Sequence, residues 1–222
     1  MLSRYIRRTV AGFLLLLASA GANAQENRTV DGDALGRSAW HPVPPAASEL
    51  RAVAGTENFI ILRNVLRDRV QESWRHRDNK PHGPIATIFY ERLSDNFFAS
   101  QMYDADFRSV FDAAFAARGV DLDDADVTVI DARTRAATVS YRATTCVFVL
   151  RVFGPIADNP ISAAESNGDR NARIFVCAQN VTDQAPLRDT ATAMLSILGA
   201  EGGRPDSLPA LLEKLFESEK GA

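Results

Sequence analysis

The chain has 222 residues, with 25 Lys and Arg against 28 Asp and Glu, and 46% of its residues are hydrophobic. This length suffices for one domain with a real core. The mild acidity argues against a nucleic-acid-binding surface.

The first 24 residues are typical of a secretory signal. A basic start is followed by a short apolar core, Thr9–Gly21, and by the small residues Ala22 and Ala24. The apolar core is shorter than the roughly 20 residues that span a bilayer. We therefore expect residues 1–24 to be a signal peptide that is cleaved after Ala24, leaving a chain without a transmembrane anchor.

The signal predicts a soluble bacterial protein that is periplasmic or secreted. The pair Arg7-Arg8 raises the twin-arginine route, but the following residues fit that pattern poorly, which favours the general secretory route. The signal contains three of the basic residues and no acidic one, so the remaining chain has 22 basic against 28 acidic residues, a formal charge of -6.

Two cysteines follow the signal, and an even number is usually paired in an oxidising compartment. Cys146 and Cys177 both lie in apolar, β-branched segments, residues 144–153 and 173–179. Neither has a Cys-x-x-Cys partner, which a redox thiol would favour. We predict a structural disulfide that joins two adjacent antiparallel strands.

Residues 25–46 are polar and then rich in Pro and Ala, and we expect an extended N-terminal arm. Trp40 on this arm either docks against the domain, which is the more common case, or meets a partner. Thr56 is placed to cap a helix from Glu57 to Arg77, because apolar residues recur every three or four positions. These apolar positions are Phe59, Leu62, Leu66, Val70 and Trp74.

The outer face of that expected helix is basic and includes Arg63, Arg67 and Arg75. Basic helical faces can meet anionic partners or lipid head groups, although many are simply solvated. These three arginines are the candidate partner-binding residues, for a protein or an anionic envelope component.

Residues 78–84 predict a loop. Residues 85–103 fit either a helix or a strand, and their spacing favours a helix. A helix is expected over 105–118, capped by Asp104 and ended by Gly119. Alternation then predicts strands near 127–130, 137–142, 146–153 and 174–178. Two final helices are expected near 186–198 and 207–219. The predicted fold is one α+β domain, residues 47–222, with an antiparallel sheet of three to five strands packed against several helices.

Two polar clusters resemble metal sites only loosely. His76, Asp78 and His82 have a spacing that zinc could use, but the segment is ordinary turn chemistry. The acidic run from Asp121 to Asp126 lacks the residues of a calcium-binding hand and favours a solvated turn. We expect no metal and no cofactor.

No motif marks a catalytic site, because the chain has no G-x-S-x-G, no S-x-x-K and no glycine-rich phosphate loop. The catalytic residues, if any, are unknown. We therefore expect an exported, non-enzymatic domain that binds a protein or cell-envelope component. The alternative is an envelope-directed enzyme of the hydrolase type with dispersed catalytic residues.

Overall fold

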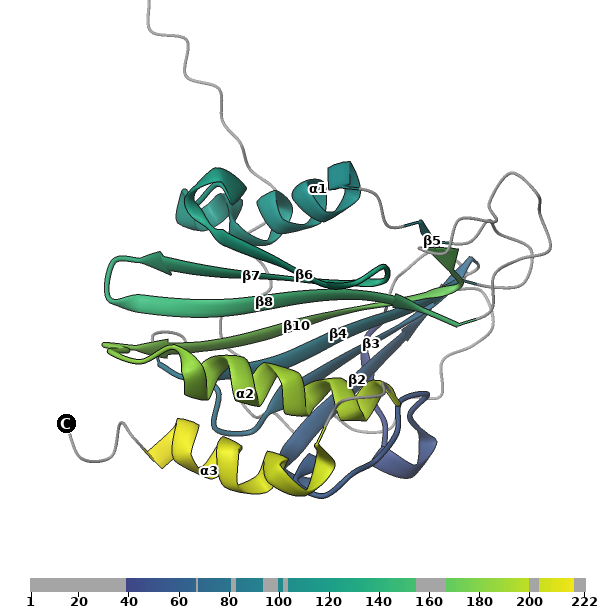
Figure 1. Cartoon of the computed structure of the whole chain (residues 1–222). Helices are drawn as coiled ribbons and strands as arrows, with labels where there is room; N and C mark the ends of the chain where they lie inside the picture. The colour runs from purple at the N-terminus through teal and green to yellow at the C-terminus, as the bar shows by residue number, and fades with distance from the viewer. Residues whose placement is uncertain are drawn as a thin grey trace, which may run out of the picture. The chain divides into compact units, whose positions relative to one another are not determined.

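A large antiparallel sheet dominates the computed structural model, which describes residues 39–66, 68–80, 83–93, 100–101, 104–154, 167–199 and 204–217. Its eight strands have the order β1-β2-β3-β4-β10-β8-β7-β6, and all of them except β1 are labelled in Figure 1. The three α-helices in this part of the chain are α1 (Asp104–Phe115), α2 (Ala185–Met194) and α3 (Leu208–Glu217). The prediction of a three- to five-stranded sheet packed against several helices is therefore wrong, because the fold is mostly sheet.

The strands of the large sheet are β1 (His41–Pro42), β2 (Phe59–Val65), β3 (Arg69–His76), β4 (Ile85–Leu93), β6 (Asp126–Asp131), β7 (Thr134–Tyr141), β8 (Thr144–Phe153) and β10 (Arg170–Gln179). Two short strands, β5 (Ser100–Gln101) and β9 (Asn167–Gly168), pair with each other in a separate small sheet.

The segment 57–77 is the β2–β3 hairpin and not the predicted helix. Ile61 pairs directly with Trp74, and both side chains are buried on the same face of the sheet. Leu62 pairs with Ser73 on the opposite face, because successive strand residues alternate. The apolar residues of this segment fit the spacing of two that is typical of a strand as well as the spacing of three or four that is typical of a helix. The pairing of β3 with β4 stabilises the strand conformation.

Residues 85–93 form β4, so the helix favoured for 85–103 is wrong over this part, while residues 94–99 lie outside the described residues. β4 pairs with β3 on one side and β10 on the other. Ala86, Ile88 and Tyr90 are at most 1% exposed. Ile85, Thr87 and Phe89 on the other face are half-buried. Both faces therefore carry apolar side chains, and the sequence lacks the alternation that would mark the strand.

The second half of the chain follows the sequence prediction closely. Helix α1 begins at Asp104, and the 3₁₀ turn that follows it, Ala116–Arg118, ends at Gly119, whose φ of 67° suits glycine. β6, β7, β8 and β10 occupy the four predicted strand regions. Helix α2 has Pro186 in its first turn and continues as a 3₁₀ turn to Leu198.

Each face of the sheet carries a hydrophobic core. One core packs α2 and α3 against β2, β3, β4, β10 and β8, and Trp74, Ile174 and Leu187 are buried in it. The other packs α1 against β7, β8 and β10. In that second core the ring of Phe148 lies 4.9 Å from the ring of Phe175 and 5.8 Å from that of Phe111.

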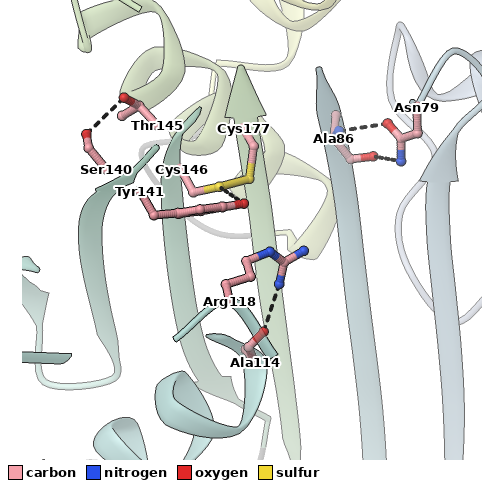
Figure 2. The surroundings of a disulfide bond; sticks show 9 residues. All are labelled: Asn79, Ala86, Ala114, Arg118, Ser140, Tyr141, Thr145, Cys146 and Cys177. Carbon is pink, nitrogen blue, oxygen red and sulfur yellow. Dashed lines mark hydrogen bonds between the residues drawn. A yellow bond between two sulfur atoms is a disulfide. The ribbon is translucent and has the colours of Figure 1, made fainter. Parts of the chain in front are cut away.

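Cys146 on β8 and Cys177 on β10 are direct cross-strand partners, and their sulfur atoms lie 2.05 Å apart. Both are buried in the core beneath α1. The Tyr141 hydroxyl lies 3.8 Å from the Cys146 Sγ, and the hydroxyls of Ser140 and Thr145 are 2.9 Å apart (Figure 2). The structure thus confirms that the two cysteines lie on adjacent antiparallel strands at disulfide distance.

The N-terminal arm is described only from Ala39, so residues 1–24 and most of the arm lie outside the described residues. His41 and Pro42 pair with Arg63 and Leu62 at the edge of β2. The Trp40 ring lies 6.2 Å from the Phe89 ring on β4. The predicted docking of Trp40 on the domain is confirmed.

Candidate binding surface

The arginines of the predicted basic helix do not share one face. Arg63 pairs with Glu72 on the α2 side of the sheet, whereas Arg75 projects from the opposite side because it lies three residues after Glu72 on β3. Arg67 lies outside the described residues. The prediction of a basic helical face is therefore wrong. That these arginines bind a partner stays a prediction.

Arg63 serves a buried carboxylate. Glu72 is fully buried and accepts the Arg63 Nη2–H at 2.6 Å and the Trp74 Nε1–H at 3.1 Å. It also accepts the Ser48 hydroxyl at 2.5 Å and the Glu49 backbone N–H at 3.1 Å. Arg63 in addition donates to the Ala47 carbonyl. This Glu72 cluster ties the segment before β2 to the sheet.

Glu49 extends the same attachment. Arg92 on β4 donates to its two carboxylate oxygens at 2.6 and 2.8 Å, and the Tyr90 hydroxyl donates at 3.0 Å. The Arg92 hydrogen bond lowers the pKa of Glu49, against the opposing effect of burial. Burial is also the main reason that the pKa of Tyr90 is raised. The side chains of Glu49, Tyr90 and Arg92 thus bind one another. We infer that they attach the segment before β2 to β4.

A polar row crosses the opposite face of the sheet, and no sequence pattern indicated it. Asn64 donates to Gln71 at 3.3 Å, and Gln71 donates to Glu91 at 2.7 Å. Asn171 and Arg69 also donate to Glu91, at 3.4 and 3.3 Å. These five residues come from four neighbouring strands in register, so the row holds strands together.

His76, which has a zinc-like spacing to Asp78 and His82 in the sequence, is part of an aromatic stack. Its ring lies 4.1 Å from that of Phe216 on α3 and 5.4 Å from that of Phe59. Its Nδ1 accepts the backbone N–H of Asp78 at 3.3 Å. His82 lies outside the described residues, and the part of the chain that the structure describes contains no group of three possible metal ligands.

A hollow of about 300 Å³ lies beside this stack, lined by Arg77, Asp78, Asn79, Lys80 and Phe216. Asn79 closes the β3–β4 connection by donating to the Ala86 carbonyl and accepting its N–H, at 3.2 and 2.8 Å (Figure 2). Four of the five lining residues thus belong to the connection between β3 and β4, and one of them, Asn79, already joins these two strands.

The stack makes stability sensitive to acid. Burial lowers the pKa of His76 from its ordinary 6.5, with a smaller opposing effect from Asp78. The imidazole of His76 therefore binds a proton near pH 6.5 in the unfolded chain, but only at lower pH in the folded chain. Because the unfolded chain binds more protons in this range, the free energy of unfolding falls as the pH drops from about 7 to about 5. We expect His76→Phe to flatten this slope, measured by urea unfolding at each pH.

The effect of Glu49 does not overlap with that of His76, because the lowered pKa of Glu49 produces a loss of stability only below about pH 4.5. The two effects therefore separate along the pH axis. An unchanged slope between about pH 7 and pH 5 in His76→Phe would show that other groups cause the acid sensitivity.

The acidic run before β6 caps a turn. Asp121 accepts the Asp123 N–H at 3.0 Å at the start of the 3₁₀ turn Leu122–Asp124. Arg108 on α1 pairs with Asp123 at 2.6 Å and Asp121 at 3.4 Å. The two aspartate side chains are 76% and 61% exposed. These contacts fit the solvated turn that the sequence favoured.

Strand β6 carries three of the five large apolar side chains that are exposed in the described part of the chain. Among the described strands it forms one edge of the large sheet, next to β7 (Figure 1). Val127, Val129 and Ile130 are 43%, 63% and 50% exposed. The sequence predicted this strand but not its position at an edge.

The other edge of the sheet is built differently. β1 has only two residues, His41 and Pro42, and a proline cannot donate to a further strand. Short edge strands with proline are a common protection against pairing with other chains. β6 has six residues and no proline, so the two edges differ in the access they offer.

None of the helices in the described residues is long and apolar enough to cross a membrane.

Comparison with known proteins finds no match: no family model, no curated protein and no solved structure is similar to this chain.

Proposed function

We propose that the chain is an exported, non-enzymatic domain that binds another protein of the cell envelope through β6. The observation that supports this is the exposure of Val127, Val129 and Ile130 next to one another on a sheet edge. Single exposed apolar residues are ordinary, whereas a group of them is typical of an interaction site.

Two further features support the proposal. The leader sequence is typical of export, and a cysteine pair at disulfide distance is compatible with an oxidising compartment. Among the described residues, the buried carboxylates of Glu72 and Glu91 hold strands and connecting segments together. Binding is therefore the function that the geometry supports best.

A photoreactive amino acid at position 130 tests the proposal in cells. We expect a protein adduct whose yield falls when Val127 and Val129 are both replaced by threonine. Threonine keeps the β-branched shape and removes apolar surface. Because both positions are exposed, the substitutions should change the free energy of unfolding by no more than about 0.5 kcal/mol each. Adduct yield on a denaturing gel, with mass spectrometry of the partner, is the measurement.

Val65 supplies a matched control, because it is 61% exposed against 63% for Val129 but lies on β2. Val65→Thr should leave the adduct from position 130 unchanged. The proposal fails if the Val127→Thr/Val129→Thr variant gives as much adduct as the parent. It also fails if Val65→Thr reduces the adduct equally.

A further inference from the structure

Strand β6 offers a partner its backbone as well as its side chains, because among the described strands only β7 pairs with it. Its residues Asp126–Val129 pair regularly with residues 135–138 of β7, and the register shifts between Val129 and Asp131. No described strand pairs with its outer side. The N–H and C=O groups on the outer side of an edge strand are a template for a further strand.

Proline and lysine, two of the residues that commonly block such an edge, are missing from β6. The central side chains of the strand are Val127, Thr128 and Val129. The bulge after Val129 shortens the regular ladder to four residues, Asp126–Val129, without covering it. An extended segment can therefore pair with these four residues.

The charge around β6 indicates which kind of segment fits. Residues 121–131 contain five aspartates and no Lys or Arg. Asp126 at the start of β6 is 73% exposed and Asp131 at its end is 47% exposed. Their arginine partners, Arg188 and Arg151, lie at 3.2 and 3.3 Å. The Asp126–Arg188 pair is exposed on both sides and therefore weak, so a partner's cation can compete for the Asp126 carboxylate. The Arg151 side chain is only 19% exposed, but the Asp131 carboxylate that it meets is 47% exposed and can accept a second cation.

The same charges disfavour a second copy of this chain. Two β6 strands side by side would bring two aspartate-rich segments together, and like charges opposite each other destabilise strand pairing. The aspartates of β6 would attract a basic segment, whereas they would repel the same aspartates of a second copy.

Resting on the proposed function, we propose that the partner adds to β6 as a further strand, through an extended apolar segment flanked by Lys or Arg. Such strand addition combines backbone hydrogen bonds with contacts from alternate side chains. Val127 and Val129 would face the apolar side chains of that segment, and Asp126 and Asp131 its basic ends.

Three synthetic peptides test the proposal on the purified protein. Each has the core Thr-Val-Thr-Val-Thr, flanked on both sides by lysine, serine or glutamate. We expect the lysine peptide to bind best, with a loss of up to about five-fold for each ion pair removed. Binding of the lysine peptide should weaken with salt and should slow hydrogen exchange at backbone amides of β6.

A lysine peptide with N-methylated alternate residues is the matched control, because it keeps the side chains and loses backbone donors. Equal binding of this peptide, no order among the three flanks, or no binding at all would overturn strand addition. A dimer in sedimentation experiments that Val127→Thr/Val129→Thr abolishes would identify a second copy as the occupant and also overturn it. The adduct from position 130 separates the two proposals: if it forms while the peptides fail, protein binding stands and strand addition is wrong.

Discussion

Replacing Glu72 with alanine is expected to lower the free energy of unfolding by about 3 kcal/mol, the lower end for breaking a buried ion pair. Glu72 is fully buried, and the Arg63 side chain that it neutralises is only 20% exposed. The substitution leaves the Trp74 Nε1–H and the Glu49 N–H without their acceptor. Urea unfolding followed by tryptophan fluorescence measures the loss.

Asp123→Asn is the control for this variant, because it also removes a carboxylate that pairs with an arginine. The Asp123 side chain is 76% exposed, so we expect the free energy of unfolding to stay close to that of the parent. Glu72→Gln, which keeps acceptor oxygen but loses charge, should fall between the two. If Glu72→Ala unfolds at the parent's urea concentration, the cluster does not hold the segment before β2 in place.

The Glu72 cluster also explains why the basic face was misjudged. A row of arginines on a predicted helix has no visible partner in the sequence, since Glu72 lies nine residues after Arg63 and a helix would not bring them together. In the hairpin the two residues are direct cross-strand neighbours. Arg63 is therefore expected to contribute to stability, in contrast to the solvated role that a helical face implies.

The error over residues 57–77 arose from ambiguous periodicity. Phe59, Leu62, Leu66, Val70 and Trp74 match a helical stripe, yet Phe59, Ile61 and Trp74 match one face of a hairpin equally well. Long-range pairing with β4 decides between the two, and a local pattern contains no information about that pairing.

The second half of the chain, from α1 to α2, was predictable because its local signals agree. Alternation at Ala137, Val139 and Tyr141 defines a strand whose two faces differ. Gly119 and Gly199 end helical segments where the backbone turns left-handed, with φ of 67° and 69°. The cysteine pairing followed from an even count and from two apolar runs.

The candidate surface could be predicted only in part. Val127 and Val129 marked a strand, but the sequence does not say which strand ends the sheet, because strand order depends on pairing between distant segments. The signal that was present is the aspartate at each end, Asp126 and Asp131, since charged flanks are common where a strand meets water. Both faces of β6 are exposed, and this exposure depends on the position of the strand in the sheet, which the sequence does not show.

Removing the cross-link between β8 and β10 is expected to cost about 3–4 kcal/mol of stability in the chain-entropy account of disulfides. Cys146 and Cys177 are 31 residues apart, so the bond restricts a loop of moderate length in the unfolded chain. Chemical reduction of the parent and the variant Cys146→Ala/Cys177→Ala should lower the urea midpoint by similar amounts. The variant loses slightly more because both side chains are buried.

Thiol labelling links this stability to the bond itself. In the unfolded, unreduced protein we expect no reactive cysteine, and after reduction both should react. Reduction changes no side-chain volume, so a shared loss in the reduced parent and the double variant assigns the effect to the cross-link, not to a cavity. Two reactive thiols before reduction would contradict the disulfide. An unchanged urea midpoint after complete reduction would instead mean that the pairing of β8 with β10 holds the second core without help from the bond.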